Sequence, residues 1–339
     1  MIRPCLHTDG PRKSSPTPLL HVEDLHVRFA SDTGPVAAVN GISLRLEPGE
    51  TLVVLGESGS GKSVMAQALM GVVPSPPGVV TIRKLRLNGT DLLRQSPTAH
   101  RRLRGREMAL IFQDALTSLN PRFTIGTQLC EMLRVHLGLS RRAARDRAVQ
   151  LLALVGIPSP RVRLDAYPHQ FSGGMRQRAL IAMAVALNPK LLIADEPTTA
   201  LDVTVQAQIL DLIKRLQKQA GMGLILITHD LSVARQIADR VAVMYAGRIV
   251  ETARTRDLFE RPGHPYTEGL MRSTPRAAAL GSPLAPIAGS PPDLRKLPHG
   301  CAFHPRCPRA IGICRAEPPP MRVISRAHSS LCHLAEEVE

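Results

Sequence analysis

Several residue types that mark particular functions are scarce in this 339-residue chain. It contains no tryptophan, and aromatic residues make up only 3% of the sequence. Because bases of single-stranded nucleic acids bind by stacking on aromatic rings, this scarcity argues against such binding. No apolar run approaches the roughly 18–20 residues that cross a membrane, and the first residues lack the apolar region of a secretory signal. We therefore expect a cytoplasmic protein that reaches a membrane only through partners.

Acidic residues are also few relative to basic ones. The sequence has 43 Lys and Arg against 28 Asp and Glu, which gives a net charge of +15. Such an excess suits either a nucleic-acid partner or a solvated basic surface, including one beside an anionic membrane leaflet. The modest arginine clusters at 101–106 and 141–147 contain no aromatic residue. We favour the solvated surface and predict no nucleic-acid partner.

The first half of the chain divides into three stretches of different character. Residues 1–18 hold four prolines and indicate a disordered leader. Short strand-like segments at 25–29, 42–46 and 51–55 predict neighbouring strands of an antiparallel sheet. A helix is expected at 62–72 and a turn-rich β segment at 74–90. From about 98 to 187 the pattern is mainly helical.

The second half returns to alternating strands and helices. We expect buried strands at 190–194 and 224–228 on either side of a helix at 205–220, and a hairpin at 241–250. This order favours a parallel sheet with an inserted helical region. The last 79 residues contain 13 of the 29 prolines, so we interpret 261–339 as an appended, loop-rich domain.

The most specific motif follows the strand predicted at 51–55. It fits the pattern G-x-x-x-x-G-K-[ST] between a strand and a helix, which is the context of a phosphate-binding loop. In such a loop, glycines let backbone N–H groups surround phosphates, the lysine meets the β- and γ-phosphates, and the final hydroxyl binds Mg²⁺. The predicted ATP-binding residues are Gly56, Glu57, Ser58, Gly59, Ser60, Gly61, Lys62 and Ser63.

A pair of carboxylates follows the apolar strand predicted at 190–194. A buried parallel strand would bring Asp195 and Glu196 to the sheet edge beside the phosphate-binding loop. There, Asp195 could hold Mg²⁺ and Glu196 could orient or deprotonate the attacking water. The carboxylate pair alone is weak evidence for a catalytic site, because acidic pairs are common on protein surfaces. Together with the phosphate-binding loop it becomes strong evidence.

A third motif, Phe171-Ser172-Gly173-Gly174-Met175, resembles the signature motif of ABC ATPases, with departures at Phe171 and Met175. The resemblance extends over residues 19–260. It implies an α/β fold of the P-loop NTPase class, with a RecA-like core, an antiparallel β-subdomain and a helical subdomain at about 98–187.

The resemblance also implies roles for further residues. Gln113 resembles the glutamine that touches Mg²⁺ and senses the membrane partner, and His229 resembles the histidine that contacts the γ-phosphate. Ala200-Leu201-Asp202 resembles the D-loop at the dimer interface, and Phe29 lies where the family has an adenine-stacking aromatic; Phe29 is also readable as a core residue. In a head-to-tail dimer, Ser172, Gly173 and Gly174 would face the nucleotide held by the partner.

The C-terminal part resembles oligopeptide and dipeptide importer ATPases. The resemblance rests on Gly263-His264-Pro265-Tyr266-Thr267 and on four cysteines, Cys301, Cys307, Cys314 and Cys332, with Phe303-His304-Pro305-Arg306 among them. Some members of that group look able to hold a [4Fe–4S] cluster on these cysteines, and we expect one here. Four thiolates also suit Zn²⁺, and plain reduced thiols are a third possibility.

Together these resemblances imply an importer subunit that hydrolyses Mg·ATP on the cytoplasmic face of the bacterial membrane. Its partners would be a second ATPase subunit, two permeases and an extracytoplasmic binding protein. Dipeptides or oligopeptides are the expected substrates, with nickel, glutathione or another small solute as alternatives. A soluble ABC ATPase of DNA repair fits less well, because only 109 residues separate Lys62 from Ser172 and leave no room for a long coiled coil.

Overall fold

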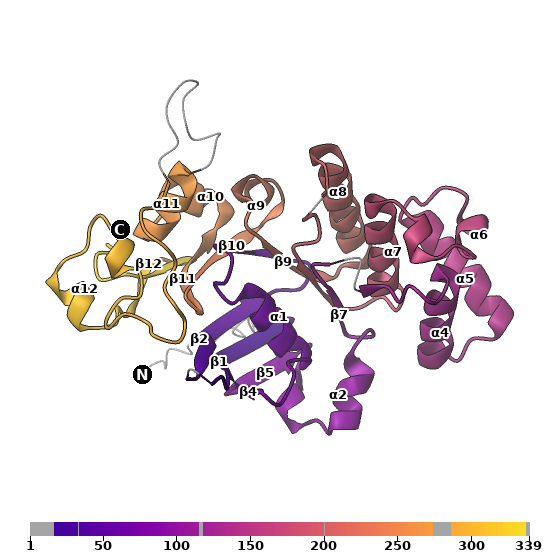
Figure 1. Ribbon diagram of the computed structural model, residues 1–339, viewed down its shortest axis with the longest axis horizontal. Coiled ribbons are helices and arrows are strands. Elements are labelled where there is room, and N and C mark those ends of the chain that lie inside the picture. Colours follow the sequence, from indigo (N-terminus) through magenta and orange to yellow (C-terminus); the bar gives the residue numbers. More distant parts are fainter. Residues whose placement is uncertain (1–16, 33, 115–117, 200, 274–285, 337–339) are drawn as a thin grey trace, which may run out of the picture.

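The computed structural model describes residues 17–32, 34–114, 118–199, 201–273 and 286–336 (Figure 1). All but two residues of the predicted leader at 1–18 lie outside this part of the chain, and so does Ala200 of the predicted D-loop.

An eight-stranded mixed sheet forms the centre of the molecule, in the order β12-β13-β11-β10-β3-β9-β8-β7. The pairing is parallel from β10 to β7 and antiparallel from β10 to β12. Its strands are β3 (Thr51–Leu55), β7 (Met108–Ile111), β8 (Leu191–Asp195), β9 (Gly223–Thr228), β10 (Arg240–Tyr245), β11 (Arg248–Arg254), β12 (Met321–Ser325) and β13 (His328–Leu331).

A smaller antiparallel sheet lies beside it. Its strands are β1 (Leu20–Phe29), β2 (Val36–Leu46), β4 (Gly78–Thr81), β5 (Lys84–Leu87) and β6 (Thr90–Asp91). The antiparallel pairing of the first two predicted strands is confirmed. The assignment of 51–55 to this sheet was wrong, because Thr51–Leu55 pairs in parallel with β9 and β10. All five of its residues are buried, as expected for a parallel strand that is covered on both faces.

The helices cover both faces of the central sheet. The α-helices are α1 (Lys62–Met70), α2 (Pro97–Leu103), α4 (Ile125–Leu137), α5 (Arg141–Leu154), α6 (Pro160–Arg163), α7 (Gly173–Val185), α8 (Val203–Ala220), α9 (Leu231–Ile237), α10 (Thr255–Glu260), α11 (Pro265–Arg272) and α12 (Gly312–Ala316). Short 3₁₀ turns occur at η1 (Leu92–Arg94), η2 (Pro168–Gln170) and η3 (His304–Arg306). Within the described residues, no helix combines the length and the apolarity that a membrane crossing requires.

Strand β3 separates two hydrophobic cores. Leu52 and Val54 pack in one core with α1 and the antiparallel sheet, whereas Val53 and Leu55 pack in the other with helices α4, α5, α7 and α8. This alternation follows from the two-residue period of a strand. Packing on both faces fixes the end of β3, and therefore the position of the loop that follows it.

The region predicted to be mainly helical contains one strand of the central sheet. Strand β7 pairs in parallel with β8 and precedes the group of helices from α4 to α7 at one end of the molecule (Figure 1). The C-terminal residues lie at the opposite end, and their β13 pairs with β11, so they extend the central sheet. The limits of the ATP-binding domain (19–260), its helical subdomain and the extension (261–339) remain predictions.

Candidate functional site

Four neighbouring parallel strands bring the predicted catalytic residues to one edge of the central sheet. The phosphate-binding loop follows β3, Gln113 lies two residues after β7, Glu196 follows β8, and His229 follows β9. Because these strands run in the same direction, their carboxyl ends lie side by side, which is where ligands bind in open α/β sheets. The sheet therefore gathers residues that are far apart in the sequence.

Two glycines of the loop are required by close backbone contacts. A Cβ atom at Gly56 would lie 2.2 Å from the Met244 carbonyl oxygen, and one at Gly61 would lie 2.2 Å from the Ala38 carbonyl oxygen. Gly61 also has a φ of 100° at the start of α1, in the left-handed region that favours glycine. The loop thus presents backbone rather than side chains at the helix N-terminus, as anion binding requires.

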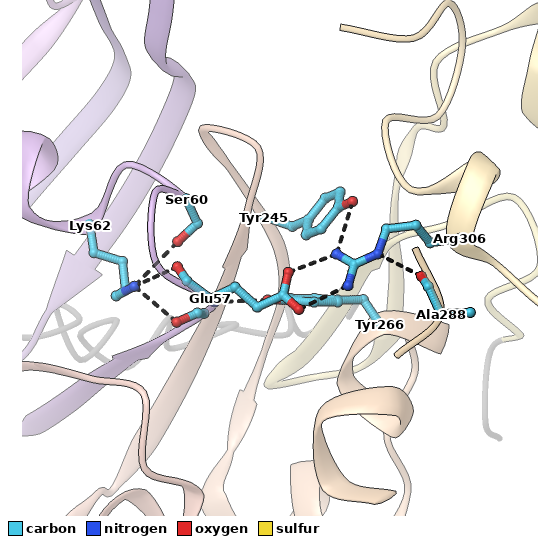
Figure 2. A network of polar contacts seen from close by, with 8 residues as sticks. Glu57, Ser60, Lys62, Tyr245, Tyr266, Ala288 and Arg306 are labelled. Atoms are coloured by element: carbon cyan, nitrogen blue, oxygen red, sulfur yellow. Dashed lines mark hydrogen bonds and ion pairs between the residues drawn. The ribbon is translucent and has the colours of Figure 1, made fainter. Parts of the chain in front are cut away.

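The ammonium group of Lys62 lies inside the loop. Its Nζ atom donates to the carbonyl oxygens of Gly56 at 2.9 Å and Glu57 at 2.8 Å, and it approaches Ser60 Oγ at 3.4 Å (Figure 2). Burial lowers the pKa of this ammonium, whereas the negative charges of Glu196, Asp195 and Glu57 oppose the shift. The loop therefore holds a buried positive charge that can meet phosphate oxygens.

Asp195 is buried with an incomplete set of hydrogen bonds. Burial raises the pKa of its carboxyl, the hydrogen bond from Ser63 opposes this rise, and the nearby Glu196 adds to it. No described residue donates a hydrogen bond to Asp195 Oδ1. A buried oxygen without a partner is costly unless a ligand supplies the interaction. Ser63 and Asp195 are therefore a suitable pair of oxygen ligands for Mg²⁺.

The Glu196 carboxylate is the meeting point of the predicted catalytic residues. Its Oε2 atom accepts hydrogen bonds from Gln113 Nε2 at 3.1 Å and Thr199 Oγ1 at 2.8 Å, and it lies 3.6 Å from His229 Nδ1. Glu196 has a φ of 44°, an uncommon conformation for a residue with a side chain. Strained backbone of this kind is typical of active sites, where it points a functional group in a required direction.

The Ser-Gly-Gly turn lies apart from this cluster, at the start of α7. Ser172 is the N-cap of α7, since its hydroxyl accepts a hydrogen bond from the Met175 N–H. A Cβ atom at Gly174 would lie 2.9 Å from Val205 Cγ1, so packing against α8 accounts for that glycine. Within one chain, the contacts found for this turn are therefore with its own helix and with the start of α8.

Two further predicted residues have clear structural roles. Asp202 is the N-cap of α8, because its Oδ1 accepts from the Val205 N–H at 2.9 Å. Phe29 is partly buried and packs against the core beside the antiparallel sheet. Nucleotide stacking by Phe29 and a dimer contact by Asp202 remain predictions.

Comparison with known proteins decides the family. The sequence profile described as ABC transporter matches residues 39–199, and the profile described as oligopeptide/dipeptide transporter, C-terminal region, matches residues 250–314. The chain is 49% identical to the dipeptide transport ATP-binding protein DppD of Bacillus subtilis over 319 residues, which cover 94% of this chain and 95% of DppD. The chain belongs to the oligopeptide/dipeptide group of ABC transporter ATP-binding proteins. The oligopeptide transport ATP-binding protein OppD of Bacillus subtilis is 51% identical over 92% of this chain and 87% of its own length.

Solved structures confirm the predicted fold of this ABC protein. The dimeric structure of the ATP-binding cassette MJ0796 bound to ADP and Pi matches with a TM-score of 0.62 at 25% identity, and covers 70% of this chain and 99% of that chain. The structure of cbiO1 from Clostridium perfringens matches with a TM-score of 0.60 at 27% identity, and covers 72% of this chain and 91% of that chain.

The four cysteines of the C-terminal extension gather in one place. Burial raises the pKa of the Cys301 thiol, and its neighbours Cys314, Cys332 and Cys307 contribute to the same rise. Their sulfur donors suit iron–sulfur or zinc chemistry. However, the described part of the chain contains no group of three or more Cys, His, Asp or Glu residues arranged to hold a metal ion. The structure therefore does not support the expected [4Fe–4S] cluster beyond placing the thiols near one another.

A connection between the extension and the phosphate-binding loop was not predicted. Arg306 forms a two-pronged ion pair with Glu57, with Nη1–Oε2 at 2.7 Å and Nη2–Oε1 at 3.0 Å (Figure 2). The Tyr266 hydroxyl accepts a hydrogen bond from the Glu57 N–H at 2.9 Å. Arg306 and Tyr266 both belong to motifs that the sequence analysis used only to assign the subfamily. The motifs were therefore visible in the sequence, but nothing in them indicated a contact with the phosphate-binding loop.

Proposed function

We propose that this chain binds and hydrolyses Mg·ATP to drive the import of dipeptides or oligopeptides through an ABC transporter. The observation that carries the ATPase part is the gathering of the phosphate-binding loop, Asp195, Glu196, Gln113 and His229 at one sheet edge. The identity of about half to peptide-transport ATP-binding proteins over more than 90% of the chain supports the peptide part.

The arrangement suggests a role for each residue of the site. The loop from Gly56 to Ser63 would hold the phosphates, with Lys62 turning from loop carbonyls to phosphate oxygens. Ser63 and Asp195, together with Gln113, would hold Mg²⁺, which when bound neutralises the charge that develops on the phosphates.

Glu196 would accept a proton from the attacking water. Gln113 and Thr199 hold the carboxylate by donating to the same oxygen, Oε2, and the other oxygen would accept the proton from water. His229, whose side chain is 64% exposed, would contact the γ-phosphate.

A second subunit would complete each ATP site. Ser172 and Gly173 are exposed at the N-terminus of α7 and Gly174 is partly buried, and this terminus would offer N–H donors to a nucleotide on a neighbour. The solved cassette with ADP and Pi is dimeric, which supports this arrangement, with Asp202 at the interface. The partner is either a second copy or a homologous ATPase subunit.

The remaining partners would be two permease subunits and an extracytoplasmic binding protein, with this chain on the cytoplasmic face of the bacterial membrane. A tagged chain purified from detergent-solubilised membranes should recover a permease pair. In liposomes, the recovered complex with its binding protein should hydrolyse ATP faster when dipeptides or oligopeptides are added.

A matched pair of variants makes this test specific. Lys62→Met should abolish ATP hydrolysis, whereas Lys218→Met, at an exposed position in α8, should leave it unchanged. Stimulation by nickel or glutathione but not by peptides would redirect the substrate assignment. Recovery of DNA or ribosomes in place of permeases would overturn the transport function.

The cysteine group supports a second proposal of narrower scope. We propose that Cys301, Cys307, Cys314 and Cys332 bind a [4Fe–4S] cluster that holds the loop-rich extension together. Two of these thiols are buried and two are partly buried, and they lie near one another in a region with little regular structure. Protein purified without oxygen should be brown and contain about four irons per chain. Colourless protein with one zinc per chain would show that the cysteines bind zinc instead of a cluster. Metal-free protein of full stability would show that they hold no structural metal.

A further inference from the structure

The ion pair between Glu57 and Arg306 connects the C-terminal extension directly to the phosphate-binding loop. The two residues are 249 positions apart in the sequence. The Arg306 side chain is 5% exposed and that of Glu57 is 25% exposed, so the contact is largely shielded from water. Shielded charges interact more strongly than exposed ones, and the two-pronged geometry is the strongest form of an arginine–carboxylate contact.

Arg306 is held in place by three further contacts. Its Nε atom donates to the Ala288 carbonyl at 3.0 Å, and Nη1 lies 3.4 Å from the Tyr245 hydroxyl (Figure 2). Its guanidinium also lies 5.8 Å from the centre of the Tyr245 ring. The hydrogen bonds that Arg306 donates to Glu57 raise the pKa of the Arg306 guanidinium above its ordinary value. The guanidinium is thus permanently charged and fixed in orientation.

Aromatic packing holds the surrounding structure. The rings of Tyr245 and Tyr266 are 4.6 Å apart, and Phe303 lies 5.2 Å from Tyr245 and 5.4 Å from Tyr266. These three residues come from β10, α11 and the segment just before Arg306. A protein with only three tyrosines and six phenylalanines therefore places three of these nine rings at this contact.

The position of Glu57 explains why its charge matters. Glu57 is the second residue of the loop, its carbonyl oxygen accepts a hydrogen bond from Lys62 Nζ, and its carboxylate affects the Lys62 ammonium electrostatically. A negative charge that acts on the phosphate-binding lysine also repels a triphosphate. Arg306 offsets that charge and fixes the loop through Glu57.

We propose that Arg306 is a positioning residue of the ATP site, which neutralises Glu57 so that the loop can accept a triphosphate. This inference rests on the proposed function, since it assumes that the loop binds ATP. Under it, the extension has a direct part in nucleotide affinity. An uncompensated carboxylate must weaken ATP binding more than ADP binding, because ATP carries the additional negative charge.

The test is a double-mutant cycle with Arg306→Met, Glu57→Gln and both changes together, in which dissociation constants for Mg·ATP and Mg·ADP are measured on the full-length protein. Arg306→Met should weaken ATP binding roughly tenfold and ADP binding less, by an amount that shrinks as salt increases. In the Glu57→Gln background, the same change should have an effect within about twofold. Arg306→Lys keeps the charge and should retain most of the affinity.

The outcomes separate this inference from the function on which it rests. If the unchanged protein fails to bind ATP, the proposed function fails. If it binds ATP but Arg306→Met weakens ATP and ADP equally, or weakens ATP as much in the Glu57→Gln background, then Arg306 acts only on the fold and the inference is wrong. Thermal unfolding of each variant identifies any that do not fold, and Arg306→Lys keeps the question testable in that case.

Discussion

The buried histidine that begins helix α11 predicts a specific loss of stability at acid pH. His264 is 2% exposed, and its Nδ1 atom accepts a hydrogen bond from the Tyr266 N–H at 3.0 Å, which requires the neutral ring. Burial lowers the pKa of His264 from 6.5 to about 4. The unfolded chain therefore binds a proton between pH 6.5 and 4 that the folded chain does not, so stability falls as pH falls through this window.

The size of this effect follows from the shift. Each pH unit inside the window lowers the free energy of unfolding by up to about 1.4 kcal/mol, for a total of about 3 kcal/mol near pH 4. The pH dependence from this histidine is half its maximum at pH 6.5 and fades within about one unit above it. Carboxylates also take up protons in this pH range and change the stability. A reference variant without the histidine separates the effect of His264 from theirs.

His264→Asn is that reference, because asparagine can still accept the Tyr266 N–H at the N-cap but does not titrate in this range. Urea unfolding can be followed by tyrosine fluorescence, because the protein has no tryptophan to mask it. Two of the three tyrosines, Tyr245 and Tyr266, pack against each other, so their emission reports on this region. Between pH 6.5 and 4.5 the unchanged protein should lose stability more steeply than the variant. Parallel curves for the two proteins would refute the assignment of a buried, neutral His264.

Two further predictions concern the ATP site. Gly61→Ala should abolish ATP binding, because the added Cβ would lie 2.2 Å from the Ala38 carbonyl oxygen. Gly49→Ala is the control, since Gly49 also has a positive φ but a Cβ there would meet nothing within 4 Å. This control variant should bind ATP normally in the same titration. Thr199→Val removes a hydrogen bond to Glu196 and should lower turnover roughly tenfold in a phosphate-release assay, whereas Thr199→Ser should restore it. Normal binding by Gly61→Ala, or equal rates for both Thr199 variants, would contradict these assignments.

The sequence indicated which residues would come together more clearly than it indicated how the strands pair. The loop, Asp195, Glu196, Gln113 and His229 were named from their motifs, and the structure brings them to one sheet edge; their roles remain predictions. Thr51–Leu55 was assigned to the wrong sheet, since a local pattern does not state which strand will pair with it. Strand β7 was missed because four apolar residues between helical segments fit a helix as well as a strand.

The contacts between distant segments could not be predicted. Arg306 and Glu57 are brought together by the packing of Tyr245, Tyr266 and Phe303, and no periodicity in the sequence reports such a contact. Ser172 combines a local role with a distant one. Its role as the N-cap of α7 depends only on neighbouring residues, whereas its proposed contact with a nucleotide depends on a second subunit.

The most direct test of the account measures ATP-driven peptide uptake with the catalytic carboxylate removed. Complexes containing the unchanged chain or Glu196→Gln would be reconstituted in liposomes with the binding protein, and ATP binding, phosphate release and uptake of a labelled dipeptide would be compared. The account predicts that Glu196→Gln assembles and binds Mg·ATP normally but hydrolyses it about 10² to 10⁴ times more slowly, with uptake lost in parallel. Uptake and phosphate release at the unchanged rate in Glu196→Gln would contradict it.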